Sequence, residues 1–237
     1  MLNRLSLVLL SAVGVAISTA AIDSSAAVAA SLSPERYADS VISYEKGWSR
    51  NWGNSLYNNA ETALGEANWN SEMVHGGELG AWKGDIGVSL GKGGALTLGF
   101  TDNYLTGSGN SDSDLWIFEI GRRPEDVLVE ISIDGDTWYS AGVADKQDYA
   151  VDTGIGIDID SLLSSHADLD SDSLFSFVRL TDNGTNGYGG GKSGADIDAV
   201  AALSSASKPE AADVPEPGMV GALGVVAFGT LLRRKQG

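Results

Sequence analysis

The chain contains no cysteine, so no disulfide bond can hold its fold together. Packing must stabilise the fold instead, with bound metal ions as a possible supplement. Basic residues are also scarce: 15 Lys and Arg stand against 32 Asp and Glu, a formal net charge of −17. This balance argues against nucleic acid as a partner, because phosphates are bound mainly by Lys and Arg. It permits divalent cations, which carboxylate oxygens bind well, although an acidic surface also serves solubility alone.

The N-terminus has the layout of a secretory signal peptide. Arg4 precedes an apolar run from Leu5 to Ile17, and small residues follow, with an A-x-A pattern over 27–29. The run has the length of a signal-peptide core and is short for a membrane span, which needs about 20 residues. We therefore expect a signal peptide over 1–29 that is removed on export. A retained membrane anchor is the alternative.

The C-terminus, residues 214–237, carries a Pro-Glu-Pro motif, an apolar stretch over 218–232 and a basic cluster, in that order. The apolar stretch can enter a bilayer while the basic cluster stays on the cytoplasmic side, and the prolines deny a regular helix to the segment left outside. An ordinary C-terminal anchor is the alternative. The motif and the cluster comprise Val214, Pro215, Glu216, Pro217, Arg233, Arg234 and Lys235.

This tail resembles the PEP-CTERM sorting signal of bacterial surface proteins. The resemblance implies recognition and cleavage by an exosortase-type processing protease. It also implies that the C-terminus enters the membrane transiently during sorting. The processed protein would then reside at the cell surface or in the extracellular matrix.

Between the two ends we expect one domain over 30–203 and a flexible linker over 204–213. The clearest unit is a hairpin over 126–141, where apolar residues alternate from Val127 to Ile133 and Asp134-Gly135 supplies the turn. Helical turns are predicted near 60–64 and 161–165, and a polar loop over 102–113. Further short strands are predicted at 41–44, 85–90, 95–100, 115–120, 155–159, 174–180 and 197–203.

Short strands separated by turn signals, without a long helical period, predict an all-β fold, an antiparallel β-sandwich of the jelly-roll type. An N-terminal signal helix and a C-terminal hydrophobic helix would flank it. The segments 94–103, 114–119, 129–138, 177–182 and 194–200 occur in an order that resembles a jelly-roll module of bacterial surface proteins, distantly similar to discoidin and galactose-binding-like sandwiches. The resemblance covers about 64–203. It implies a non-catalytic module that binds glycans or other surface ligands, often with a structural calcium.

Acidic residues stand at several predicted strand ends. Residues far apart in sequence can meet at one rim of a jelly roll, and Ca²⁺ takes oxygen ligands at about 2.4 Å. The alternative is that these side chains cap turns by bonding to nearby backbone. The candidate metal ligands are Asp102, Asp112, Asp114, Asp196 and Asp198.

A second candidate site is the segment around residues 48–69, which is rich in aromatic residues and Asn. Aromatic rings can cover the apolar faces of sugars while amides bond to their hydroxyls, so the segment suggests a platform for extracellular polysaccharide. Alternatively, the rings fill the edge of the core. The candidate glycan-binding residues are Trp48, Trp52, Tyr57 and Trp69.

One motif points toward an enzyme. Residues 87–91 fit the G-x-S-x-G pattern around Ser89, and the chain has His75 and His166. The hydrolase elbow joins a strand to a helix, however, and a further strand is predicted here. We therefore expect an exported, sorted, non-catalytic β-sandwich that binds polysaccharide. The alternatives are a secreted hydrolase, either a glycosidase with paired carboxylates or an esterase, and a structural coat protein without a specific ligand.

Overall fold

The computed structural model describes residues 32–48, 57–69, 87–120, 125–145, 154–184 and 194–209. The predicted signal peptide, the sorting signal and Trp52 lie outside these residues. Within them, no helix has the length and apolar character needed to cross a membrane.

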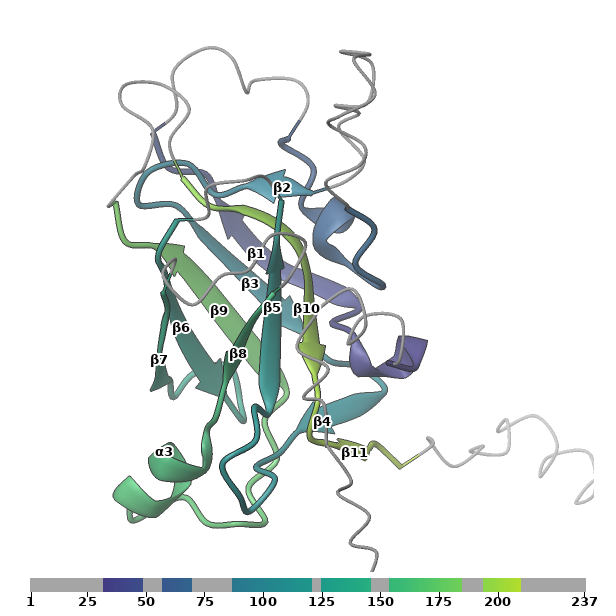
Figure 1. The fold of residues 1–237 in the computed structure, drawn as a ribbon, viewed down its shortest axis with the longest axis vertical. Coiled ribbons are helices and arrows are strands. Elements are labelled where there is room, and N and C mark those ends of the chain that lie inside the picture. Colours follow the sequence, from purple (N-terminus) through teal and green to yellow (C-terminus); the bar gives the residue numbers. More distant parts are fainter. Residues whose placement is uncertain are drawn as a thin grey trace, which may run out of the picture.

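Two antiparallel sheets form the body (Figure 1). The larger has the order β1-β3-β9-β6-β7, and the smaller has the order β2-β10-β5-β8. The strands of the larger sheet are β1 Ser40–Glu45, β3 Ala95–Gly99, β9 Phe177–Asp182, β6 Val127–Ser132 and β7 Tyr139–Ala144. Those of the smaller are β2 Val88–Ser89, β10 Asp196–Ala202, β5 Leu115–Glu119 and β8 Ile155–Ile157. The predicted all-β antiparallel sandwich is confirmed.

Short elements complete the fold. A two-stranded ribbon pairs β4 Asn103–Leu105 with β11 Ser205–Ser207. The helical elements are η1 Pro34–Arg36, η2 Ala60–Ala63 and α3 Asp160–Ser165. The ribbon was not predicted: β4 falls in the expected polar loop and β11 in the expected linker. Each strand is too short to show an apolar alternation. Each forms because it pairs with the other.

The core lies between the facing sheets, and period-two alternation explains it. Val127, Val129 and Ile131 of β6 are buried, while Leu128, between the first two in the sequence, is 41% exposed. The predicted hairpin is confirmed, with Gly135 at φ 82° in its turn. Other buried side chains are Leu96, Leu98, Leu115, Ile117, Phe175, Val178, Leu180, Ile197 and Val200.

The outer face of the smaller sheet carries a second apolar cluster. Phe118 packs near Tyr37, with ring centroids 6.1 Å apart, and Trp116 lies 6.5 Å from Phe118. Ala199 and Ala201 of the neighbouring strand complete the cluster. The segment around η1 therefore covers this face, and both faces of β5 are used for packing.

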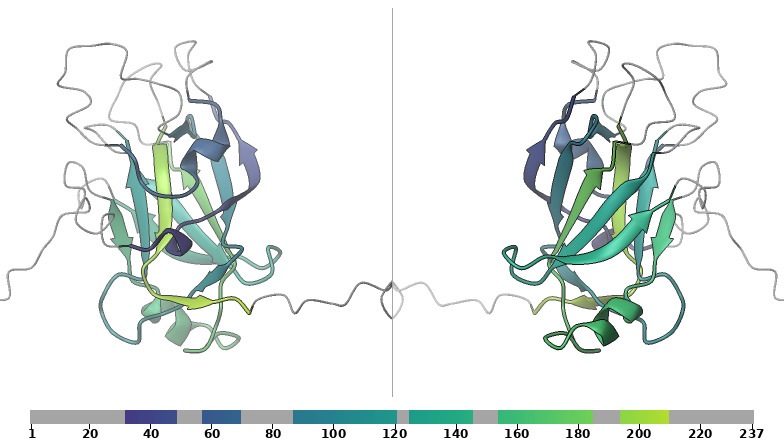
Figure 2. Two further views of the ribbon diagram at one scale, coloured as in Figure 1. Left: turned by 90° about the vertical axis from the view of Figure 1, so that its right-hand side faces the viewer. Right: turned by 90° about the vertical axis from the view of Figure 1, so that its left-hand side faces the viewer.

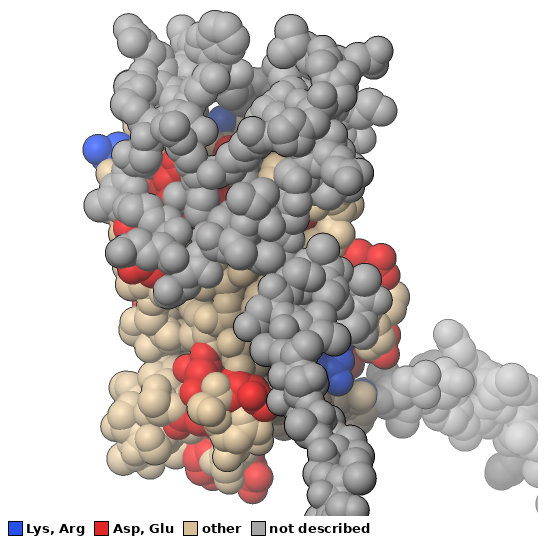
Figure 3. All heavy atoms as spheres, in the orientation of Figure 1, with Lys and Arg blue, Asp and Glu red and all other residues tan. Residues whose placement is uncertain are grey.

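The two ends of the sandwich differ (Figures 1 and 2). At one end lie β2 and the turn between β2 and β3; we call this the tryptophan end, because Trp48 is bridged to Lys92 there. At the other end lie α3, the β4–β11 ribbon and the loop over 106–114; we call this the carboxylate end. Acidic side chains gather over the lower part of the face shown in Figure 3.

Candidate functional site

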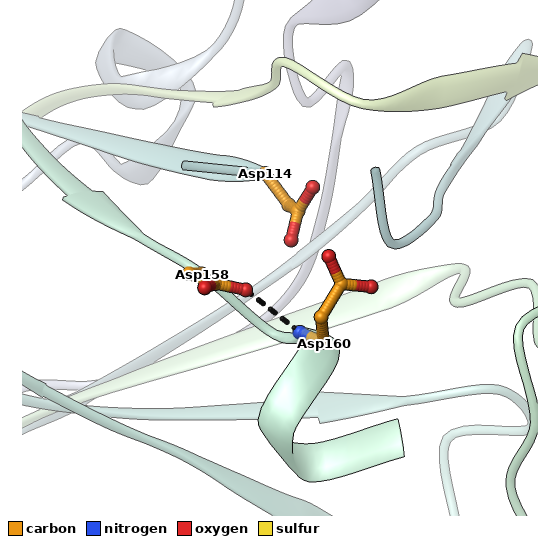
Figure 4. A group of neighbouring side chains, drawn as sticks. All are labelled: Asp114, Asp158 and Asp160. Carbon is orange, nitrogen blue, oxygen red and sulfur yellow. Dashed lines mark hydrogen bonds between the residues drawn. The ribbon is translucent and has the colours of Figure 1, made fainter. Parts of the chain in front are cut away.

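Three carboxylates converge at the carboxylate end (Figure 4). Asp114 precedes β5, Asp158 follows β8 and Asp160 begins α3. One oxygen from each lies within 4.8 Å of the others. Ile159, between the last two, is fully buried and has α-region backbone angles (φ −97°, ψ −2°), so the chain turns between Asp158 and Asp160.

A hydrogen-bond donor fixes one oxygen of each carboxylate. The Ile159 amide donates to Asp114 Oδ2 at 3.0 Å, and the Asp160 amide donates to Asp158 Oδ1 at 2.9 Å. Asp160 Oδ2 accepts from the Asn110 amide at 3.0 Å and from the Ser108 hydroxyl at 3.2 Å. Such bonds hold the carboxylates in fixed orientations, as outer-shell hydrogen bonds do for metal ligands.

The remaining oxygen of Asp114 is the unusual one. The side chain is completely buried, and its Oδ1 accepts no hydrogen bond. Burial raises the pKa of Asp114, assisted by the charge of Asp160, while the Ile159 amide and Ser108 act in the opposite direction. A buried carboxylate with one oxygen unpaired is costly, and adjacent carboxylates repel one another.

A bound cation would remove both costs. One oxygen each from Asp114, Asp158 and Asp160 makes an all-oxygen donor set, which suits hard divalent cations rather than soft ones. The orphaned buried oxygen fits such an ion better than it fits a purely structural role. The group could therefore hold a metal ion.

Asp114 also joins three parts of the chain through its backbone. Its amide donates to the Ile157 carbonyl at 2.9 Å. Its carbonyl accepts from the amides of Leu203 and Ser204, at 2.7 and 3.1 Å. An ion here would thus brace the loop before β5, the β8–α3 junction and, through Asp114, the end of β10.

Of the predicted metal ligands, only Asp114 belongs to this group. Asp196 pairs with Ser89 at the other end, and six residues along β10 separate it from Ala202 beside Leu115, roughly 20 Å at 3.3 Å per residue. Asp198 instead accepts from the amides of Asn68 and Trp69. The structure does not bring Asp102 or Asp112 into the group either; both are exposed.

Sequence reasoning missed Asp158 and Asp160. The available signal was the Asp-x-Asp pattern after the apolar run over 155–159. The same pattern occurs at Asp196 and Asp198, so the pattern alone does not identify ligands.

The aromatic candidates have different environments. Trp48 is 59% exposed, whereas Tyr57 and Trp69 are half-buried. The Tyr57 carbonyl accepts from the Ser89 amide, and the Trp69 amide donates to Asp198. Within the described residues, Trp48 is therefore the candidate whose ring faces solvent most fully.

The backbone beneath Trp48 is fixed. The Trp48 and Lys92 amides donate to each other's carbonyls at 3.1 and 2.9 Å, and the Gly47 amide donates to Leu90 at 2.8 Å. A Cβ on Gly47 would lie 2.3 Å from the Lys92 carbonyl oxygen, so only glycine permits this approach. The exposed ring thus stands on tightly packed backbone.

The Asp182 carboxylate also holds the backbone of this region through hydrogen bonds. Its Oδ1 accepts from the amides of Gly93 and Gly184, both at 2.9 Å, and its Oδ2 accepts from Ala195 at 3.1 Å. These bonds join the β2–β3 turn, the segment after β9 and the start of β10. A buried acid at this end is therefore satisfied by the protein itself.

The G-x-S-x-G segment does not form a hydrolase elbow. Ser89 ends β2, which pairs with β10, and the chain turns into β3 rather than into a helix. His166 caps α3 at the opposite end. Ser89 and His166 therefore do not meet, and His75 lies outside the described residues.

Comparisons with known proteins include a likeness to a solved structure. No family model matches the chain, and no curated protein matches it. The fold is similar to the C-terminal domain of a chitobiase from Bacteroides fragilis, with a TM-score of 0.37 and 14% sequence identity, over 75% of this chain and 99% of that domain. No residue role is transferred from it.

Proposed function

We propose that this chain is an exported, non-catalytic β-sandwich that binds extracellular polysaccharide at the tryptophan end. The observation that carries the proposal is Trp48, which holds a 59% exposed ring on backbone that glycine packing and Asp182 make rigid. A large apolar ring that is mostly exposed contributes little packing of its own, and the rigid backbone beneath it lowers the entropy lost when a ligand orders this segment.

The test is affinity electrophoresis in gels that contain soluble polysaccharides from an exopolysaccharide-producing bacterium. Trp48→Ala should abolish retardation, and Trp48→Phe should retain part of it. Ile42→Ala is the matched control, because Ile42 is also exposed, at 53%, and lies on the edge strand β1. Equal retardation of the wild type and Trp48→Ala would contradict the proposal.

We also propose that the carboxylate end binds Ca²⁺. Calcium takes six to eight oxygens in adaptable geometry, while Mg²⁺ demands a near-ideal octahedron. Carboxylates from Asp114, Asp158 and Asp160, supplemented by water or loop carbonyls, suit the former better. Its role would be to brace this end, since the chain has no disulfide.

The route to the surface remains part of the proposal. The N-terminal apolar run and the Pro-Glu-Pro tail support export followed by exosortase cleavage, which would leave the sandwich at the surface or in the matrix. Mass spectrometry of the exported protein tests this. The expected mature chain begins near Ala30 and ends between Val214 and Pro217, and an intact chain would contradict it.

A further inference from the structure

Lys92 lies beside Trp48 at the tryptophan end. The two residues form an antiparallel bridge. Directly opposed residues of such a pair place their side chains on the same side, with Cβ atoms about 5.5 Å apart. The side chains of Lys92 and Trp48 therefore leave the backbone on the same side.

Lys92 differs from the other basic residues in the described part of the chain. Arg36 donates to the Leu203 carbonyl, Lys46 donates to Asn58, Arg179 pairs with Glu130 and Lys208 donates to the Phe100 carbonyl. All four are half-buried. Lys92 is exposed, and among the described residues its ammonium group has no hydrogen bond or ion pair.

This is unexpected in a protein of net charge −17. An ammonium group among so many carboxylates would ordinarily find one. Asp182, a buried acid at this end, accepts hydrogen bonds from three backbone amides, which stabilise its charge without Lys92. Within the described part of the chain, Lys92 thus presents a positive charge without a carboxylate partner, on a residue bridged to Trp48.

We propose that Trp48 and Lys92 together bind an anionic polysaccharide, with the ring against the apolar face of a uronic acid residue and the ammonium group paired with its carboxylate. This inference rests on the proposed function and specifies its ligand class. The general repulsion between two acidic molecules is screened over about 8 Å at physiological ionic strength, so a contact at closer range decides the binding.

The experiment compares retardation by one polymer in two charge states: polygalacturonate, and the same polymer after methyl esterification of its carboxylates. Calcium is omitted, because it crosslinks the free acid. Wild type should be retarded by the free acid and at least threefold less by the ester. Lys92→Gln should lose about threefold to fivefold in affinity for the free acid and little for the ester, and Lys92→Arg should restore the preference. Lys208→Gln is the matched charge control, because Lys208 lies at the other end.

The outcomes separate the two claims. If Trp48→Ala loses retardation while Lys92→Gln behaves as wild type on the free acid, the anionic ligand is wrong and the polysaccharide site stands. Equal retardation of wild type by acid and ester also overturns the inference. If Trp48→Ala remains retarded by every polysaccharide tested, the proposed function itself fails.

Discussion

The two ends of the sandwich hold their loops in different ways. At the tryptophan end, Asp182 accepts three backbone amides and glycines allow backbone to pack on backbone. At the carboxylate end, Asp114 is equally buried, yet one of its oxygens has no donor and faces two further carboxylates. The first end is complete without a ligand, whereas the second has the donor set of a site that an ion would complete.

The largest expected effect tests whether glycine packing makes the tryptophan end rigid. A Cβ on Gly94 would lie 1.9 Å from the Leu90 carbonyl oxygen, so Gly94→Ala should lower the free energy of unfolding by about 3 kcal/mol. Gly93→Ala is the control. Nothing lies within 4 Å of its Cβ, and only its φ of 72° is strained, so it should cost about 1 kcal/mol. Equal losses in urea unfolding would contradict the packing argument.

Calcium tests the carboxylate end. At a free concentration of 100 times its dissociation constant, an ion that binds only the folded state should add about 2.7 kcal/mol. Differential scanning calorimetry at neutral pH, with and without a chelator, should show this gain in wild type. Asp114→Asn should abolish it. Asp112→Asn, in the same loop but outside the group, should retain the calcium-dependent gain in stability. An unfolding midpoint of wild type that does not change with calcium would refute the site.

The third prediction concerns the pH dependence of the free energy of unfolding, to which Asp196 at the tryptophan end contributes. Burial raises the pKa of Asp196, at the tryptophan end, to about 6, against the opposing effects of Ser89 and Lys46. The folded state therefore holds this proton more tightly than the unfolded chain, and the resulting stability is present below about pH 4 and lost as pH rises through 6. The loss should be on the order of 1 kcal/mol, because partial exposure weakens the effect.

The measurement is urea unfolding at pH 5 and pH 7 in the presence of chelator. Asp196→Asn should reduce the difference between the two values. Other carboxylates also titrate in this range, so the comparison that matters is wild type against this variant. An unchanged difference would show that Asp196 does not couple to folding.

The smallest effect concerns Trp48. Since the ring is largely exposed, Trp48→Ala should change the free energy of unfolding by less than about 0.5 kcal/mol. Binding and stability would then separate at this residue. A loss above 2 kcal/mol in urea unfolding would assign Trp48 to packing.

Local pattern predicted much of the fold. The alternation from Val127 to Ile133 around Asp134-Gly135 specified the β6–β7 hairpin, because one face had to be buried and the turn residues suit a tight reversal. The helical turn over 161–165 and the short turn near Ala60 were also predicted and observed. The β4–β11 ribbon was not predicted, because its pairing joins segments about a hundred residues apart and Leu105 is its one buried apolar side chain.

Two copies of one sequence pattern show which properties can be predicted from the sequence and which require the tertiary structure. Asp158-Ile159-Asp160 and Asp196-Ile197-Asp198 have the same pattern, and in both the isoleucine between the two acids is fully buried. The partners of those acids were decided only by the fold. Asp198 received the amides of Asn68 and Trp69, whereas Asp160 was placed opposite Asp114. The physical reason is that the hydrogen-bond donors belong to segments distant in the sequence. Only the fold shows whether such donors surround an acid, which separates a satisfied acid from a candidate metal ligand.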